Sequence, residues 1–248
     1  MVSIFIFWIL LSLIIYCYIG YPLLLFFFSF VKKLIRRKRL GPETIEFPDV
    51  TIVIAAYNEK NFVNQKIQNI LSLNYPQNKI KQIWVTDGST DGTPELLLTY
   101  SNLKVIHFAE RLGKAMAINH AMEHVETPIT VFSDANTLLT PNALIELVKP
   151  FQNHNVGCVA GEKQILIQQN SAASSTGEGI YWKYESFIKK LESETGSTLS
   201  AAGELYAIRT ALFKRIPADT ILDDFEVSTQ IALSGFTVKY AEKAIASE

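Results

Sequence analysis

The stretch Val50-Thr-Ile-Val-Ile-Ala-Ala56 decides the fold of this 248-residue chain. It is short, rich in β-branched residues and apolar at nearly every position, which is typical of a strand covered on both faces of a sheet. Asn58 and Glu59 follow it and end the strand. A buried strand of this kind predicts a parallel sheet in an α/β domain, with a ligand site beyond the end of the strand.

Predicted strands and helices alternate after this first strand, in units of about thirty residues. The pattern predicts further strands at 80–85, 103–108, 129–133, 156–160, 205–209 and 236–241. It predicts helices at 62–73, 113–125, 141–151, 181–191 and 226–233, and a helix start beside Pro94. We therefore expect an α/β fold with a doubly wound, mostly parallel sheet, which binds ligands beyond the carboxyl ends of its strands.

An apolar run from Ile4 to Val31 precedes this domain. As a helix it would be roughly 40 Å long, which exceeds the hydrocarbon core of a bilayer. We predict one transmembrane helix over residues 1–31, with a kink near Gly20 and Pro22. A secretory signal peptide is disfavoured, because no basic segment precedes the run, no small-residue cleavage site follows it, and an apolar signal core has only about 7 to 15 residues.

Six basic residues follow the apolar run: Lys32, Lys33, Arg36, Arg37, Lys38 and Arg39. Positive charge beside a membrane span marks the cytoplasmic side. We therefore expect residues 32–49 to form a basic juxtamembrane linker and residues 50–248 to form a cytoplasmic domain. The expected location is the plasma membrane, with a bacterial inner membrane favoured. The lipid bilayer is an expected partner, and a nucleic-acid polymer is not.

Acidic residues follow the predicted strands at three places: Asp87, Asp134 and the pair Asp223-Asp224. A doubly wound sheet brings such positions to one edge. Mg²⁺ takes oxygen ligands and needs only one or two carboxylates when phosphate and water supply the others, so a nucleotide diphosphate is the expected ligand. No Walker loop and no Gly-x-Gly-x-x-Gly motif occurs, which disfavours P-loop NTPases and Rossmann dehydrogenases.

The ordered set of motifs resembles the family-2 glycosyltransferases with a GT-A fold, over roughly Val50 to Glu248. The matching segments are Val50–Glu59, Ile83–Thr93, Arg111–Lys114 with Asn119, Phe132–Thr137, Gly203 with Tyr206–Arg209, and Leu222–Glu226. Gly177–Glu185 is similar to the membrane-bound polysaccharide synthases of this family, which make cellulose, hyaluronan and poly-N-acetylglucosamine. The resemblance implies an inverting transfer from a UDP-sugar to a glycan or lipid-linked acceptor at the cytoplasmic membrane face.

The same resemblance assigns roles to individual residues. It implies that Ala56, Tyr57 and Glu59 line the base and ribose pocket, that Asp87 binds the uracil, and that Lys114 lies near the nucleotide. Asp134, with Asn136, would hold Mg²⁺ or Mn²⁺ against the diphosphate. Asp224 would be the general base, although the adjacent Asp223 is an alternative. Tyr181, Trp182 and Arg209 would bind the acceptor; a position at the membrane interface and core packing are the alternatives for the two aromatic residues.

This chain departs from the family pattern in three respects. Thr86 stands beside Asp87 where many relatives have two carboxylates, and the second metal position is the neutral Asn136. The Gln-x-x-Arg-Trp motif of processive synthases does not occur before Glu248. Either the natural chain continues, or it is not such a synthase. Two other classes stay open: a sugar-phosphate nucleotidyltransferase, although no glycine-rich basic loop follows the first strand, and a sugar-nucleotide-binding protein without glycosyl transfer.

Overall fold

The computed structural model describes residues 1–35, 47–164, 175–199, 201 and 203–248. Within these residues one mixed sheet has the strand order β3-β2-β1-β4-β7-β6-β8-β5. The strands are β1 Val50–Ala56, β2 Ile80–Asp87, β3 Lys104–Phe108, β4 Ile129–Ser133, β5 Leu138–Leu139, β6 Val156–Gln164, β7 Leu205–Arg209 and β8 Thr237–Ser247. The predicted α/β class is confirmed.

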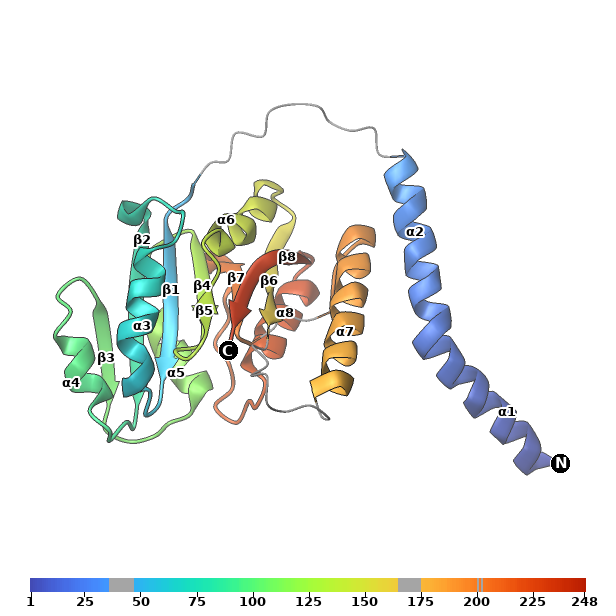
Figure 1. Cartoon of the computed structure of the whole chain (residues 1–248), viewed down its shortest axis with the longest axis horizontal. Coiled ribbons are helices and arrows are strands. Elements are labelled where there is room, and N and C mark those ends of the chain that lie inside the picture. The colour runs from blue at the N-terminus through green and yellow to red at the C-terminus, as the bar shows by residue number, and fades with distance from the viewer. Residues whose placement is uncertain (36–46, 165–174, 200, 202) are drawn as a thin grey trace.

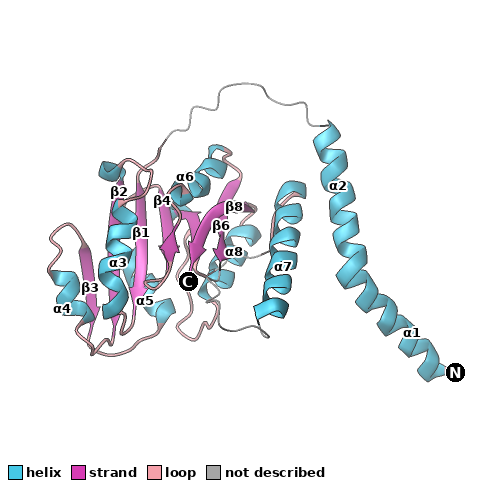
Figure 2. Ribbon diagram, in the orientation of Figure 1, coloured by secondary structure: helices cyan, strands magenta, loops and turns pink. Residues whose placement is uncertain are grey.

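Strands β6 and β8 run in the same direction as β1 and β4 (Figure 2), and only β7 and β5 run against them. Strands β3, β2, β1 and β4 are all parallel, as predicted. Strand β7 is antiparallel to both of its neighbours, β4 and β6, whereas β6 and β8 are parallel. The short β5 pairs antiparallel with β8 and was not predicted, because two residues are too few to show a period. The carboxyl ends of β1, β2 and β4 therefore meet the amino end of β7.

Helices cover both faces of the sheet: α3 Lys60–Leu71, α4 Thr93–Leu98, α5 Lys114–Met122, α6 Ala143–Val148, α7 Ser175–Thr195 and α8 Asp223–Leu233. Alternate residues of β1 enter two separate cores, because successive strand side chains point to opposite faces. Ile52 and Ile54 pack with helices α3, α4 and α6. Val53 packs with α5 and α8 on the other face. Each fully buried aliphatic side chain there contributes about 1.5–3 kcal/mol.

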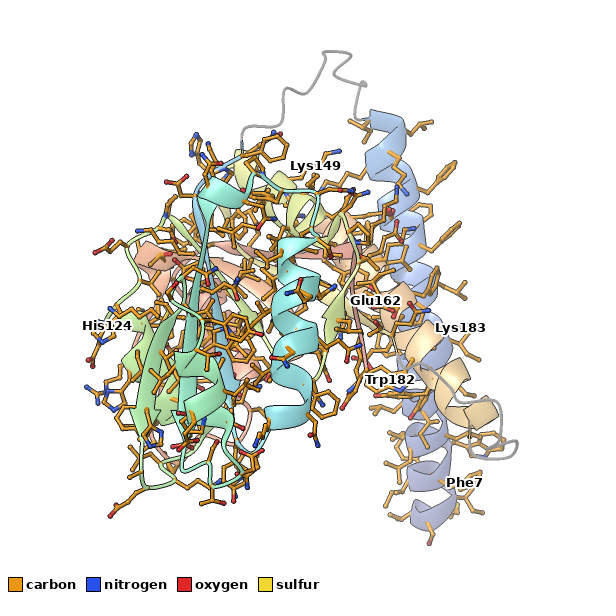
Figure 3. All side chains as sticks on the ribbon, turned by 60° about the vertical axis from the view of Figure 1, so that its left-hand side comes forward. Phe7, His124, Lys149, Glu162, Trp182 and Lys183 are labelled. Carbon is orange, nitrogen blue, oxygen red and sulfur yellow. The ribbon has the colours of Figure 1, made fainter. Side chains whose placement is uncertain are left out.

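The helix predicted over residues 141–151 is divided in the structure. Helix α6 ends at Val148, and a 3-10 turn follows over Lys149–Gln152. Pro150 lies in this turn and has no backbone N–H to continue the α-helical hydrogen bonding. Figure 3 shows Lys149 at this boundary.

The N-terminal segment is helical from Val2 to Ile35 and is long and apolar enough, by length and composition, to cross a membrane. It consists of α1 Val2–Ile15, a π-helical turn Tyr16–Gly20 and α2 Tyr21–Ile35. Pro22 cannot donate a hydrogen bond to the carbonyl four residues earlier, so the π turn lies where the helical bonding is interrupted. The irregularity is at the predicted place, but the helix continues past the predicted end at residue 31.

Helix α2 packs beside α7 of the α/β domain (Figure 1). Tyr21 Oη donates a hydrogen bond to Glu192 Oε1 at 2.6 Å. Lys33 Nζ and Glu194 form an ion pair at 2.8 Å, and Ser29 Oγ also donates to Glu194. These polar contacts join the N-terminal helix to the domain that carries the site.

Candidate functional site

The loops after β1 and β2 are bound together by hydrogen bonds. The backbone N–H of Asn58 donates to Ser89 Oγ at 3.1 Å, and Asn58 Oδ1 accepts from the N–H of Thr90 at 2.8 Å. The N–H of Lys60 donates to Asp91 Oδ2 at 3.0 Å. Asn58 has a φ of 56°, a left-handed conformation that asparagine adopts more readily than most residues. The two loops thus form one wall at the carboxyl edge of the sheet.

Asp87 holds a third loop against this wall. Its Oδ1 accepts from the N–H of Leu112 at 2.7 Å, and its Oδ2 accepts from the N–H of Gly113 at 2.8 Å. These bonds place the Arg111 guanidinium 3.9 Å from the centroid of the Tyr57 ring. Each oxygen of Asp87 still has a lone pair for a ligand. The predicted nucleotide residues Tyr57 and Asp87 are therefore brought to one wall, joined by an Arg111 contact that the sequence did not reveal.

Gly88 permits the close approach of this third loop. Its φ is +72°, and a Cβ atom there would lie 2.8 Å from the backbone nitrogen of Arg111. Its own N–H donates to the carbonyl of Phe108, at the end of β3, at 2.9 Å. Glycine is required at this position both for the backbone conformation and for the space.

Lys114 lies at the centre of the site, in the first turn of α5. Its Nζ is 2.8 Å from Asp134 Oδ1 and 3.9 Å from Asp223 Oδ1. Burial lowers the pKa of Lys114, but the carboxylates of Asp134 and Asp223 outweigh burial and raise this pKa above its ordinary value. Lys114 is therefore a permanent cation that joins the predicted metal position to the predicted catalytic pair.

Asp134 and Asn136 lie in the turn after β4, as predicted. Asn136 Nδ2 donates to Glu248 Oε1 at 2.8 Å, which leaves the carbonyl oxygen Oδ1 of Asn136 available to a ligand. Among the residues that the structure describes, no cluster of three or more His, Cys, Asp or Glu side chains is arranged to hold a metal. Asp134 and Asn136 offer two hard oxygen donors, which fit Mg²⁺ or Mn²⁺ only when a diphosphate and water complete the coordination.

The negative charge of Asp134 in this turn also acts on a further carboxylate, that of Glu59. Burial raises the pKa of Glu59, and the negative charges of Asp134, Asp91 and Glu248 raise it further. A cation bound near Asp134 would relieve this repulsion. The electrostatics of the site are therefore those expected for a position that receives positive charge.

Asp223 and Asp224 form the first turn of α8, and both lie beside the amino end of β7. Asp223 Oδ2 and the Tyr206 hydroxyl are buried without a hydrogen-bond partner among the described residues. Asp224 Oδ2 would be 3.4 Å from a Cβ at Gly203. Burial raises the pKa of both aspartates. A carboxylate with a raised pKa is a stronger base, so either oxygen pair suits proton removal.

The two predicted aromatic residues lie on α7, and Figure 3 shows Trp182. Tyr181 is 61% exposed and its ring centroid lies 5.8 Å from that of Trp182. Lys163 Nζ lies 5.9 Å from the Trp182 ring centroid and pairs with Glu204 Oε1 at 2.6 Å. Glu204 directly follows Gly203, the neighbour of Asp224. Contacts therefore connect Trp182 through Lys163 to Glu204. The exposure of Tyr181 shows that it does not pack in the core.

Arg209 does not lie at this site, and the predicted acceptor contact is wrong. It pairs with Ile129 at the beginning of β4, so it lies at the opposite end of the sheet from Asp134. Its Nε donates to the carbonyl of Val156 at 2.8 Å, and its Nη2 donates to that of Phe151 at 2.6 Å. Because β7 is antiparallel to β4, the last residue of β7 is the one farthest from the site.

One residue that the sequence analysis missed lies directly under the site. Lys66 of α3 is completely buried, and its Nζ donates to Ser133 Oγ and to the carbonyl of Thr137, each at 2.7 Å. The signal in the sequence was its position between Val63 and Ile67, on the apolar side of the helix. A lysine is almost never fully buried unless its charge is paired.

Comparison with known proteins agrees with this geometry. A family model described as glycosyl transferase family 2 matches residues 51–216. A poly-beta-1,6-N-acetyl-D-glucosamine synthase of Staphylococcus epidermidis is 25% identical over 230 residues, which are 89% of this chain and 54% of the relative. The Staphylococcus aureus synthase of the same name is 25% identical over 210 residues, covering 81% and 50%. The chain spans about half the length of these curated relatives.

Two solved structures share the fold. A mannosyltransferase, PcManGT from Pyrobaculum calidifontis, in complex with GDP-Man and Mn²⁺, has a TM-score of 0.75 and 27% identity, covering 94% of this chain and 66% of that one. Residues 1–349 of TarS from Staphylococcus aureus, in complex with UDP-GlcNAc, have a TM-score of 0.60 and 17% identity, covering 81% and 58%. The second likeness is one of fold alone.

Proposed function

Because the chain belongs to glycosyl transferase family 2, we propose that it moves a sugar from a UDP-sugar to a hydroxyl of a glycan or lipid-linked acceptor, with help from Mg²⁺ or Mn²⁺. The observation that carries the proposal is the chain of charges from Asp134 through Lys114 to Asp223. Asp134 and Asp223 lie on two sides of one cation, Lys114, and this arrangement supports a metal position beside a catalytic pair. A site for a leaving diphosphate and an attacking hydroxyl needs this adjacency.

The residues divide the reaction between them. Asp134 and Asn136 would hold the divalent cation, which offsets the charge on the departing diphosphate when it is bound. Lys114 adds a second positive charge on that side. Asp224 removes the proton of the acceptor hydroxyl as its oxygen attacks the anomeric carbon, the bond to UDP breaks, and the configuration inverts. Asp223 keeps Lys114 in place, although its unpaired Oδ2 leaves it as the alternative base.

The nucleotide pocket is proposed at the wall formed by Ala56, Tyr57, Glu59 and Asp87. Tyr57 is partly exposed beneath the Arg111 guanidinium, and these flat groups suit contact with a base and a phosphate. A free lone pair of Asp87 would accept a hydrogen bond from uracil. A second donor class is a GDP-sugar, because the mannosyltransferase of similar fold was solved with GDP-Man.

The acceptor side and the membrane setting are proposed from the other half of the molecule. Trp182 contacts Lys163, which pairs with Glu204 near the proposed catalytic pair. Tyr181 and Trp182 therefore offer aromatic rings on which a sugar acceptor can stack. The synthase names of the relatives support a polysaccharide product built from N-acetylglucosamine. The apolar helix Val2–Ile35 supports attachment to a plasma membrane, and Lys32 and Lys33 near its end support a cytoplasmic domain. Arg36, Arg37, Lys38 and Arg39 lie outside the described residues.

Equilibrium binding of nucleotides by the purified chain tests the donor and the metal together. We expect UDP to bind more tightly with Mn²⁺ than with EDTA, and more tightly than GDP. Asp134→Ala should remove the Mn²⁺ dependence. Glu126→Ala, which removes an exposed carboxylate paired with Lys81 away from the site, should not. If GDP bound more tightly than UDP, the donor would be a GDP-sugar and not a UDP-sugar. If UDP bound equally well with Mn²⁺ and with EDTA, the proposed metal would be contradicted.

A further inference from the structure

Lys66 is an unusual residue for the interior of this domain. It lies in α3 among Val63, Ile67 and Ile70, which are fully buried core residues, and it is itself 0% exposed. A buried ammonium group is unfavourable unless its hydrogen bonds are satisfied. A methionine of similar length would fill the same space without this requirement. The polar contacts of Lys66 are therefore what distinguishes it from an ordinary core side chain.

When Lys66 is protonated, all three protons of its ammonium group have an acceptor. Lys66 Nζ donates to Ser133 Oγ at 2.7 Å, to the carbonyl of Thr137 at 2.7 Å, and to Thr137 Oγ1 at 3.2 Å. A lysine ammonium has three donors, so its capacity is fully used. The acceptors belong to the two residues that bracket Asp134-Ala-Asn136. One buried group thus binds both ends of the turn that carries the proposed metal ligands.

The turn is also bonded internally and to the catalytic side. Thr137 Oγ1 donates to the carbonyl of Asp134 at 3.1 Å. Ser133 Oγ lies 3.3 Å from the carbonyl of Glu204, in the segment that precedes β7. The ammonium group of Lys66 is hydrogen-bonded to both side chains that make these bonds, Ser133 and Thr137. Removing it would leave buried oxygens of Ser133 and Thr137 with fewer partners, and the turn would lose the group that fixes its ends.

We propose that Lys66 is a positioning residue for the divalent cation: it ties the two ends of the Ser133–Thr137 turn and so holds Asp134 and Asn136 in the arrangement that receives the metal. The inference rests on the proposed function, since it assigns a supporting group to the proposed metal site. Some residues do not bind the metal themselves but orient the side chains that do. Mutating such a residue typically lowers the metal affinity by about 10- to 100-fold. Lys66 acts through the turn and touches neither ligand by a direct bond.

The test is the Mn²⁺ concentration that gives half-maximal UDP binding by the full chain in detergent. We expect Lys66→Met to raise this concentration by about tenfold or more, while UDP affinity measured in EDTA stays as in the wild type. The matched control is Ile67→Ala, which removes fully buried core atoms from the same helix. Ile67→Ala should lower the melting temperature. It should leave the Mn²⁺ concentration for half-maximal UDP binding unchanged, because the apolar side chain of Ile67 makes no hydrogen bond to the turn.

The outcomes separate the inference from the function on which it rests. If the wild type bound UDP without any Mn²⁺ dependence, the proposed metal site and the inference about Lys66 would be overturned, whereas the proposed transfer would still be decided by UDP release. If the wild type depended on Mn²⁺ and folded Lys66→Met showed the same dependence, the role of Lys66 alone would be wrong. If Lys66→Met did not fold, Ser133→Ala and Thr137→Val would be measured instead. Each removes one acceptor, so each should raise the Mn²⁺ concentration less than Lys66→Met is expected to; unchanged values in both would overturn the inference.

Discussion

The burial of Lys66 makes the stability of the domain depend on pH in a calculable way. Burial lowers the pKa of Lys66 from 10.5 to about 7, and the nearby negative charge of Asp134 only partly opposes this. In the unfolded chain the side chain recovers its ordinary pKa. Between about pH 7 and 10.5 the unfolded state therefore binds a proton that the folded state has lost. Stability must rise with pH across this range, and the substitution Lys66→Met must remove that contribution.

The size of the effect follows from the two pKa values. One proton bound only in the unfolded state changes the free energy of unfolding by about 1.4 kcal/mol per pH unit. At pH 7 the folded lysine is still about half protonated, so the gain from pH 7 to pH 9 is about 2 kcal/mol, an order-of-magnitude figure. A urea dependence of roughly 1–3 kcal/mol per molar converts this to a midpoint shift on the order of 1 M.

The assay is urea unfolding of the wild type and Lys66→Met at pH 7 and pH 9, followed by the fluorescence of the fully buried Trp84. All other titrating groups are common to the two proteins and cancel when the two pH effects are subtracted. The urea midpoint should rise between pH 7 and pH 9 by on the order of 1 M more in the wild type than in Lys66→Met. Equal gains in both proteins would show that Lys66 keeps an ordinary pKa and would refute the reasoning.

Three further substitutions test other parts of the structure. Lys114→Met removes a charge that lowers the pKa of the Asp223-Asp224 pair, so the acidic limb of the rate profile should move to higher pH; an unmoved limb would place the base elsewhere. Gly88→Ala should destabilise the domain by at least about 1–3 kcal/mol and weaken nucleotide binding, whereas Gly196→Ala, with open space around it, should do neither; the melting temperatures decide. Arg209→Ala should lower stability by about 1–3 kcal/mol and leave the KM for the acceptor unchanged; a raised KM would restore Arg209 to the site.

The sequence predicted where Ala56, Asp87 and Asp134 lie in the fold, because local signals define these positions. Strands β1, β2 and β4 are apolar runs that stop at polar residues, and their parallel arrangement brings Ala56, Asp87 and Asp134 to one edge. The family motifs added Lys114 and the Asp223-Asp224 pair, and the structure places Lys114 between Asp134 and Asp223. Short-range pattern and ordered motifs were sufficient for these positions.

The features that the sequence did not predict depend on pairing between distant segments. The direction of β7 decides which of its ends meets the site, and a five-residue strand shows no direction in its own composition. The error over Arg209 follows from this. The contact of Arg111 with Tyr57 and the bonds of Lys66 to the Ser133–Thr137 turn likewise join residues that are far apart in the chain. Each becomes visible only when the strands are assembled.

Release of UDP from a UDP-sugar tests the proposed transfer most directly. We expect the purified chain, supplied with UDP-N-acetylglucosamine, Mn²⁺ and a glycan acceptor, to release UDP. Asp224→Asn should bind UDP with Mn²⁺ as the wild type does and release almost none, because general-base assistance contributes roughly 10²- to 10⁴-fold to such a rate. Release by Asp224→Asn at the wild-type rate, or no release by the wild type with any UDP-sugar, would contradict the proposed function.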